Sequence, residues 1–404
     1  MRWYPEGAAP PAPVPFDNFL FKVASRCNLA CPYCYVYELR DQGWRSQPTS
    51  ISDATFEAGL DRIREHVLSH GQREINVIFH GGEPLLLGPE RLDILLSRVA
   101  ERLAGVSTVH LGMQTNGTLL DERFIAVARR HKLRMGLSVD GPPAHHDKYR
   151  FDHQGRGTSA QVQRAADLLR ANPDVYGGLL CVISLETPPE ELFEYLCSQG
   201  AGSVDLILPH ATHDDLPPGA ATLSDVDRYG EWLLRFLELW YRSPDGTPDL
   251  RYFSSILRLL AGGYSLVESI GLSLSSLVVI ESNGDIEAVD SLKACFEGAA
   301  VTGFNVLRDS FDAAITAPAF ASRQMGVRAL AEKCRSCSYL DVCGGGYQPH
   351  RFSKENGFVN PSIYCRSIQK IVGRLAELMS DDLERAAQPV PRLARKLSRA
   401  KTHA

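Results

Sequence analysis

Short apolar segments alternate with longer amphipathic segments along the first half of the chain. Strand-like apolar runs recur six times, at residues 19–23, 75–79, 108–113, 134–139, 176–183 and 204–208. Stretches with the spacing of an amphipathic helix separate them, at residues 52–70, 90–104, 121–131, 159–171 and 189–199. This alternation predicts an α/β fold with a parallel sheet and right-handed crossovers.

Six strand–helix units are fewer than the eight of a complete (β/α)8 barrel. We therefore predict a partial (β/α)6 barrel that is closed or nearly closed. In barrels of this kind the functional side chains lie at the carboxyl ends of the strands. Cys27, Gly81, Asn116 and Asp140 each follow a different predicted strand, so we expect them on one rim.

The pattern predicts five regions along the chain. Residues 1–17, with five prolines, form an irregular lead-in, and residues 18–221 form the partial barrel. Residues 222–283 form a helical bridge, residues 284–370 a second cysteine-bearing region, and residues 371–404 a helix with a basic tail. An aromatic stripe on the bridge is expected to be core, and it consists of Tyr229, Trp232, Phe236 and Trp240.

Composition narrows the class of protein. The chain has 404 residues, 44% of them apolar, and a net charge of -5, so it can bury a large core and has no overall basic field. Without a basic field, nucleic acid is not an expected partner. A membrane is not expected either, because no apolar run reaches about 20 residues. Seven of the ten cysteines fall in groups that suit metal, and no export signal precedes them. We expect a cytoplasmic protein.

Three cysteines directly after the first apolar run have the pattern C-x3-C-x2-C, at Cys27, Cys31 and Cys34. Three thiolates so close together can each bind one iron of a 4Fe-4S cube and leave its fourth iron open. A zinc site is the alternative, but zinc spacing usually repeats a C-x2-C pair and needs a fourth ligand. A chance group of buried cysteines is the other alternative.

This motif, followed later by Gly81-Gly82-Glu83-Pro84, resembles the radical S-adenosylmethionine (SAM) enzymes. The resemblance implies that Cys27, Cys31 and Cys34 hold a 4Fe-4S cluster whose open iron is chelated by SAM. An electron from the cluster then cleaves SAM to a 5′-deoxyadenosyl radical. It also implies a reduced electron donor such as flavodoxin or ferredoxin.

The same resemblance implies the contacts to SAM. Glu83 is the expected charged partner of its amino group, and Arg150 is the expected partner of its carboxylate, since a guanidinium pairs with both oxygens. The alternative for the Glu83 segment is an ordinary turn. The alternative for the Arg150 segment is a solvated charged loop. The full predicted set is Tyr33, Gly81, Gly82, Glu83, Pro84, Asn116, Ser138 and Arg150.

A second set of cysteines lies near the end of the chain, at Cys334, Cys337, Cys343 and Cys365. A zinc ribbon would use similar spacing. The run resembles the SPASM region, which carries auxiliary Fe-S clusters in radical SAM enzymes that act on peptides. A full region has seven cysteines, whereas Tyr347 and Asp290 occupy two of those places here and Cys295 is out of register. We expect one auxiliary 4Fe-4S cluster, held by four thiols.

Residues 344–351, 290–293 and 302–306 resemble the cyclophane-forming maturases of the Fxs type. The resemblance implies that the enzyme removes a Cβ hydrogen from a ribosomal precursor peptide, which has a leader and a core, and joins that carbon to an aromatic ring carbon. Loss of the ring proton needs a base, and Asp290 and His210 are the candidates. A supporting or loop role is the alternative for each.

Two other functions remain open from the sequence. One is a sulfatase-maturase-like oxidation of cysteine or serine to formylglycine, which normally goes with the complete seven-cysteine region. The other is a non-catalytic Fe-S or zinc scaffold that delivers peptides. No leader-recognition domain is expected before Phe19, so the barrel, the cysteine-rich region or another protein would bind the leader. Residues 391–401 hold five basic residues and no acid, which suits either an acidic leader or a solvated tail.

Overall fold

The computed structural model describes residues 1–244 and 247–385, and the basic tail at 391–401 lies outside this range. Two compact units make up the chain. The first unit comprises residues 10–179 and 275–324, and the second comprises residues 1–9, 180–274 and 325 onward. In the described residues, no helix is long and apolar enough to cross a membrane.

The first unit is built on a mostly parallel sheet that begins with the predicted strands. Its first strands are β1 (Asn18–Ala24), β2 (Glu74–Gly81), β3 (Thr108–Thr115) and β4 (Arg134–Ser138). They pair in parallel in chain order, and β5 (Tyr176–Val182) begins in this unit and ends in the other. The predicted alternation is confirmed, because the apolar runs became parallel strands and the crossovers between them became helices.

Three further strands extend the sheet beyond β1. They are β8 (Leu277–Ile280), β9 (Asp285–Glu287) and β10 (Val301–Asn305). β8 pairs in parallel with β1, while β9 and β10 add antiparallel strands at this edge. The sheet is therefore open at β10 rather than closed as a barrel. Such short strands leave little periodic signal, and β8 joins β1 from about 260 residues away in the sequence.

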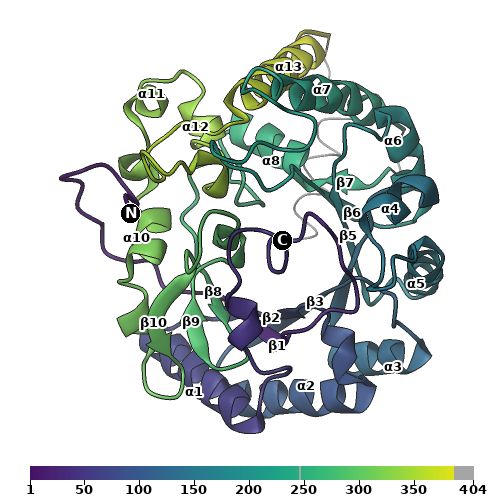
Figure 1. Cartoon of the computed structure of the whole chain (residues 1–404), viewed down its shortest axis with the longest axis vertical. Helices are drawn as coiled ribbons and strands as arrows, with labels where there is room; N and C mark the ends of the chain where they lie inside the picture. Colours follow the sequence, from purple (N-terminus) through teal and green to yellow (C-terminus); the bar gives the residue numbers. More distant parts are fainter. Residues whose placement is uncertain (245–246, 386–404) are drawn as a thin grey trace. The chain divides into compact units, whose positions relative to one another are not determined.

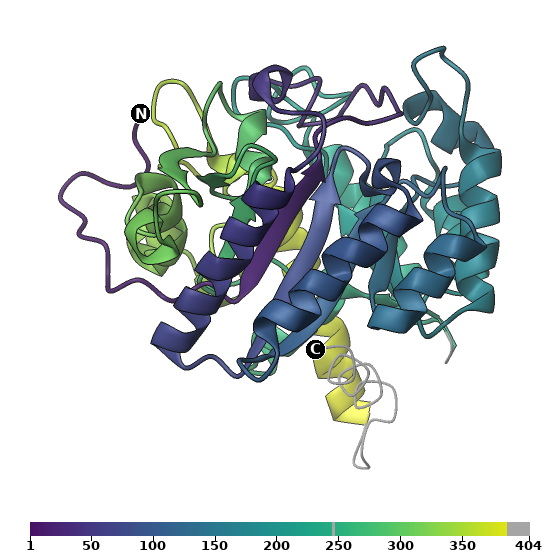
Figure 2. The same cartoon turned by 90° about the horizontal axis from the view of Figure 1, so that it is seen from below.

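Helices α1 (Asp53–His70), α2 (Pro89–Leu103) and α3 (Glu122–His131) cover one face of β1, β2 and β3, as Figures 1 and 2 show. The core lies between these layers, where the rings of Phe21 and Phe56 are 4.8 Å apart and fully buried. The other helical elements of this unit are η1 (Gly43–Ser46), η2 (Pro84–Leu87), α4 (Pro143–Tyr149), α5 (Ser159–Ala171), η3 (Asp290–Ala294), α9 (Phe311–Ala314) and α10 (Pro318–Gln324).

The second unit contains the short parallel strands β6 (Ser203–Ile207) and β7 (Asp249–Leu250). Its helices are α6 (Pro189–Ser198), α7 (Asp227–Tyr241), α8 (Arg251–Leu260), η4 (Gly326–Ala329), α11 (Glu332–Arg335), α12 (Leu340–Cys343), η5 (Pro349–Arg351) and α13 (Cys365–Arg385). Trp232 and Phe236 of α7 stack 5.2 Å apart, and the whole predicted aromatic stripe is buried. The prediction that this stripe is core is confirmed.

Candidate functional site

Cys27, Cys31 and Cys34 share the loop that follows β1 in the first unit. The Cys34 backbone N–H donates to the Cys31 carbonyl at 3.0 Å, and the Leu29 N–H donates to Cys27 Sγ at 3.4 Å. Burial raises the pKa of Cys27 to about 12 and that of Cys31 to about 11. Without a metal these thiols hold their protons, whereas bound iron stabilises the thiolates.

The Gly81-Gly82 turn at the end of β2 packs directly on the start of this cysteine loop. The Gly82 N–H donates to the Ala24 carbonyl at 2.8 Å, and the Glu83 N–H donates to the Arg26 carbonyl at 3.0 Å. A Cβ atom on Gly82 would lie 2.3 Å from the Arg26 carbonyl oxygen and 2.0 Å from the Tyr37 hydroxyl. Gly82 therefore permits the close approach of two protein loops, beyond the predicted approach to a ligand.

Glu83 is fully buried, and its carboxylate is held by protein donors. Oε1 accepts from the Thr115 hydroxyl at 2.6 Å and the Leu85 N–H at 3.0 Å, while Oε2 accepts from the Asn116 N–H at 2.7 Å. Burial raises the pKa of Glu83 to about 7, although these three hydrogen bonds favour the ionised form. Glu83 thus ties the ends of β2 and β3 together, a role that its motif did not reveal.

Arg150 and Tyr33 meet at Asp140. Arg150 Nε donates to Asp140 Oδ2 at 2.9 Å, and the Tyr33 hydroxyl donates to the same oxygen. The guanidinium carbon of Arg150 lies 5.7 Å from the Tyr33 ring centroid, so the half-buried Tyr33 joins the buried pair of Asp140 and Arg150 in one group. Asp140 was predicted only as a rim residue. Its pairing with Arg150 shows that it orients two of the predicted SAM contacts.

The remaining predicted contacts lie at the ends of β3 and β4. Asn116 Nδ2 donates to Asn28 Oδ1 at 2.9 Å and reaches Cys27 Sγ at 3.8 Å. Ser138 accepts from Gln114 Nε2 at 2.9 Å. The structure thus gathers every predicted SAM contact at the carboxyl ends of β1 to β4, in the same unit as the three cysteines. Their contact with SAM stays a prediction.

Asp290, at the start of η3, is buried against the end of β1. Its Oδ2 forms an ion pair with Lys22 Nζ and accepts from the Tyr35 hydroxyl at 3.1 Å. Burial alone would raise the pKa of Asp290, but Lys22 outweighs it and holds the pKa well below its usual range. The carboxylate is therefore ionised and only weakly basic.

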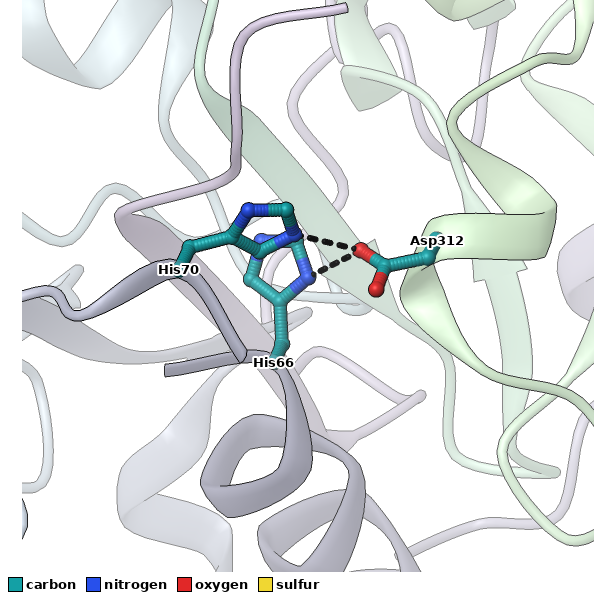
Figure 3. Close-up of side chains that lie close together, drawn as sticks. All are labelled: His66, His70 and Asp312. Carbon is teal, nitrogen blue, oxygen red and sulfur yellow. Dashed lines mark hydrogen bonds and ion pairs between the residues drawn. The ribbon is translucent and has the colours of Figure 1, made fainter. Parts of the chain in front are cut away.

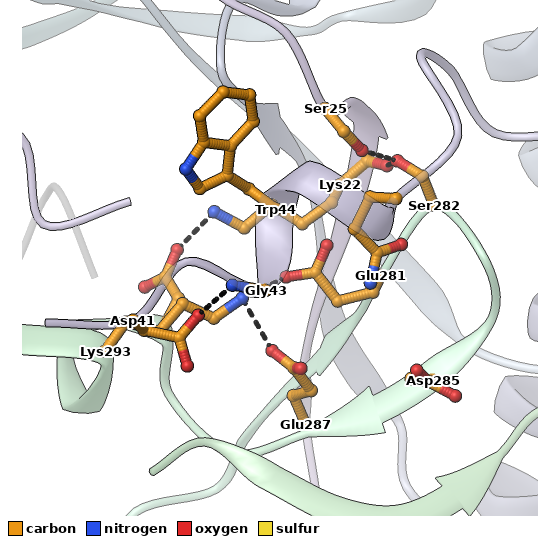
Figure 4. Close-up of polar contacts among 12 residues, drawn as sticks. Lys22, Ser25, Asp41, Gly43, Trp44, Glu281, Ser282, Asp285, Glu287 and Lys293 are labelled. Atoms are coloured by element: carbon orange, nitrogen blue, oxygen red, sulfur yellow. Dashed lines mark hydrogen bonds and ion pairs between the residues drawn. The ribbon is translucent and has the colours of Figure 1, made fainter. Parts of the chain in front are cut away.

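A second buried group of charges lies on the β8–β9 hairpin. Lys293 Nζ lies 2.6 Å from Glu281 Oε1 and 2.8 Å from Glu287 Oε2, with all three side chains about 5% exposed (Figure 4). Burial and the neighbouring Glu281 raise the pKa of Glu287 to about 8. The two carboxyls thus share one proton at neutral pH, beside the charged lysine. No motif in the sequence indicated this group.

The second unit brings the other four cysteines together. Cys334 lies on α11, Cys343 ends α12, and Cys365 begins α13. Burial raises the pKa of Cys343 to about 12, and repulsion from the thiolates of the other three adds to the shift, so Cys343 lies within electrostatic reach of all three. Gln369 Nε2 lies 3.7 Å from Cys337 Sγ, as a hydrogen-bond donor to it. The donor set fits a cluster with four protein ligands.

The spacing of the sulfurs is compatible with an iron–sulfur cube. Among the described residues, the only three ligand atoms of His, Cys, Asp or Glu that lie within 4.8 Å of one another belong to His66, His70 and Asp312. Sulfurs on one zinc ion would lie about 4 Å apart, given a Zn–S bond of about 2.3 Å. Among the described residues, neither cysteine set brings three sulfurs that close together. An iron–sulfur cube holds its ligands farther apart, because each one lies outside a different corner.

His66, His70 and Asp312 form a hydrogen-bonded cluster rather than a metal centre. The Phe16 N–H donates to His66 Nε2 at 2.9 Å, so the His66 proton is on Nδ1, which donates to Asp312 Oδ1 at 2.7 Å (Figure 3). His70 Nε2 donates to the same oxygen at 2.9 Å. A metal on Nδ1 would push the proton to Nε2, opposite the Phe16 donor. The three residues join α1 to α9.

His210, the second candidate base, lies in an aromatic group of the second unit. Its ring is 5.9 Å from Tyr347 and 6.4 Å from His350. Burial lowers the pKa of His350 to about 3, and its ring packs 4.7 Å from Tyr364. Tyr347 replaces an expected cysteine, and it contributes here to packing around His210. Sequence analysis did not single out His350, because its burial follows from tertiary packing.

Comparison with known proteins supports this description. Residues 21–196 match the model of the Radical SAM superfamily. A cysteine-type anaerobic sulfatase-maturating enzyme of Clostridium perfringens is 25% identical over 376 residues, which cover 88% of this chain and 95% of that protein. A serine-type enzyme of Klebsiella aerogenes is 28% identical over 360 residues, with 86% and 83% covered.

Solved structures agree at the level of the fold. The native enzyme titled anSMEcpe with bound AdoMet superimposes with a TM-score of 0.78 at 23% identity, covering 90% of this chain and 99% of that one. The same enzyme with AdoMet and the Kp18Cys peptide gives a TM-score of 0.77. The predicted radical SAM fold is confirmed, as are SAM and 4Fe-4S clusters as the cofactors of this class of enzyme.

Proposed function

We propose that this chain, whose residues 21–196 form a radical SAM domain, is a maturase that crosslinks a ribosomally made peptide. The crosslink would join an aromatic ring carbon to the Cβ of a nearby residue, forming a cyclophane. Two kinds of support exist for a peptide substrate. The relatives named sulfatase-maturating enzymes act on proteins, and residues 344–351 resemble the Fxs-type maturases.

Each predicted ligand has a place in this proposal. Cys27, Cys31 and Cys34 would hold the SAM-binding cluster, and the four cysteines of the second unit would hold one auxiliary cluster. When bound, SAM and its cluster supply a radical that removes a hydrogen atom from the substrate. The residues at the ends of β1 to β4 would bind and orient SAM, and Asp290 or His210 would accept a proton.

The four-thiol set of the second unit supports a radical reaction that ends in oxidation of the peptide, as crosslinking requires. The peptide loses two hydrogens, one as an atom and the other as a proton and an electron. A cluster with four protein ligands has no open iron, so it suits an electron acceptor rather than a substrate site. The remaining cysteine near η3, Cys295, is 4% exposed, and burial raises its pKa well above the usual range. It fits a core residue better than a ligand.

Formylglycine formation is the second candidate function. The matched relatives from Clostridium perfringens and Klebsiella aerogenes are named sulfatase-maturating enzymes, and the match covers most of both chains. The identity of 25 to 28% leaves room for a different peptide chemistry. The two candidates share the radical step and differ in the bond that is made.

Mass spectrometry of the product separates these functions. The enzyme is incubated anaerobically with SAM, dithionite and a synthetic peptide that has Phe two residues before Ser. We expect a loss of two hydrogens, no fragmentation between the joined residues, and no product when Phe is replaced by Ala. Serine oxidation also removes two hydrogens, but its aldehyde reacts with a hydrazine and fragmentation stays normal. A hydrazine-reactive product would favour formylglycine formation. Absence of 5′-deoxyadenosine would point to the scaffold.

A further inference from the structure

Lys22 is a buried cation beside one of the two candidate bases. Its side chain is 3% exposed, and it lies near the end of β1, five positions before Cys27. Its Nζ forms the ion pair with Asp290 Oδ2 and lies 3.5 Å from His80 Nδ1. The Lys22 carbonyl accepts from the Ser282 hydroxyl at 2.6 Å, which joins this position to the segment after β8. Both ends of the residue are thus fixed.

The ion pair leaves one oxygen of Asp290 unused. Oδ2 takes both hydrogen bonds, from Lys22 and from the Tyr35 hydroxyl. Oδ1 accepts no hydrogen bond from any residue that the structure describes, and the Asp290 side chain keeps 8% of its surface exposed. An ionised carboxylate with one fixed oxygen and one open oxygen is arranged to accept a proton at the open one.

We propose that Lys22 is a positioning residue that keeps Asp290 ionised and weakly basic, so that Asp290 accepts only strongly acidic protons, such as the proton lost from an aromatic ring carbon. This inference rests on the proposed crosslinking function and adds a residue to it.

The chemistry of ring closure explains why a weak base is sufficient. Formation of the bond between Cβ and the ring carbon leaves that ring carbon with an extra hydrogen. Aromaticity returns when this carbon loses one electron to an acceptor of the iron–sulfur class and one proton to Asp290 Oδ1. The ring is strongly acidic at that stage, so proton transfer to a weak base is downhill. A weak base also releases the proton readily afterwards.

Four groups face Asp290 and determine its charge. They are Lys22 on β1, His80 on β2, Lys293 on η3 and Tyr35 on the cysteine loop. Burial and the neighbouring Lys22 lower the pKa of His80 to about 4, so this ring is neutral at neutral pH. Lys293 is already paired with Glu281 and Glu287. Lys22 is therefore the cation on which the state of Asp290 chiefly depends.

The test compares Lys22→Gln with Lys22→Arg in the full-length enzyme with reconstituted clusters. The probe is the Phe-containing synthetic peptide, and the quantity measured is crosslinked product per 5′-deoxyadenosine formed between pH 5.5 and 9. Wild type and Lys22→Arg should give a constant ratio. In Lys22→Gln, burial would raise the pKa of Asp290, so the ratio should fall about tenfold or more as the pH decreases. Asp290→Asn should lower the ratio about 100-fold at every pH.

A constant ratio in Lys22→Gln, equal to that of wild type, would overturn the inference. A second measurement needs no substrate and therefore separates this failure from failure of the proposed function. It is a double-mutant cycle on thermal stability with Lys22→Gln and Asp290→Asn, at pH 7 and pH 5. The sum of the two single losses in Tm should exceed the loss of the double variant at both pH values, because each single variant leaves a buried charge unpaired. Additive losses would contradict the pairing.

Discussion

Single residues in the first unit carry charge in places where charge is costly to bury. Lys22 and Asp290 offset each other, and Lys293 offsets Glu281. These ion pairs contain two lysines and three carboxyls, so one carboxyl has no lysine of its own. Glu287 is that extra carboxyl. Its raised pKa is the physical result, because a proton is the cheapest way to neutralise the extra carboxyl.

Glu287→Gln tests this balance through the pH dependence of stability. The unfolded chain loses the Glu287 proton near its ordinary pKa, whereas the folded protein keeps it to about pH 8. The contribution of Glu287 to stability is therefore greatest at low pH and is lost as the pH rises through 8. Relative to the variant, the wild type should lose on the order of 3 kcal/mol in free energy of unfolding between pH 5 and pH 8.5.

Urea unfolding at several pH values measures this difference. Glu122→Gln, at an exposed position on α3, is the matched control and should leave the pH profile unchanged. A wild type that gains stability relative to Glu287→Gln as the pH rises would show that Glu287 is ionised in the folded protein, contrary to this account.

At the scale of elements, the close contact between the β2 turn and the cysteine loop is the feature most sensitive to change. Gly82 permits it, and the contact is with backbone that cannot move aside. The same loops hold the predicted cluster ligands and SAM contacts. The packing of the β2 turn on the cysteine loop, rather than any single ligand, should therefore control whether the cluster assembles.

Gly82→Ala should reduce both iron content and 5′-deoxyadenosine formation about tenfold or more, because the new methyl group forces the two loops apart. Gly112→Ala is the matched control, since its Cβ would meet only Ile78 Cγ1 at 3.7 Å. Iron analysis after anaerobic reconstitution and chromatography of the nucleoside product are the measurements. Full iron loading in Gly82→Ala would show that the loops tolerate separation.

At the scale of the whole molecule, the two cysteine sets belong to different compact units. Each set has its own supporting elements, so each cluster should assemble without the other. This arrangement predicts that the two sets can be removed one at a time.

The wild-type chain should bind about eight iron atoms after anaerobic reconstitution, as two 4Fe-4S cubes. Replacing Cys334, Cys337 and Cys343 by Ala should leave about four and preserve SAM cleavage. Replacing Cys27, Cys31 and Cys34 should also leave about four but abolish SAM cleavage. Cys197→Ala, on α6, should bind the full amount. Zinc in place of iron, or loss of all iron from either triple variant, would contradict this assignment.

Much of the fold could be predicted from local pattern. Residues 52–70 were predicted as helix and form α1 from Asp53 to His70, because an amphipathic stripe and the Ser52 cap are both local signals. β8, β9 and β10 were missed because each is short, and because β8 pairs with β1 at the other end of the chain. Within the site, Cys27 and Gly82 were recognisable from motifs, whereas Lys22 and Glu287 resembled ordinary strand residues.

The sequence by itself determined the order of strands and helices, the two cysteine sets and the expected class of chemistry, because periodicity and ligand spacing are properties of short segments. Only the tertiary structure decided the partners of Asp290, the engagement of Glu83 and the sharing of a proton at Glu287. Those properties depend on burial and on charges that meet across hundreds of residues. Burial weakens the competition from water, so a side chain's partners, rather than its identity, determine its charge and role.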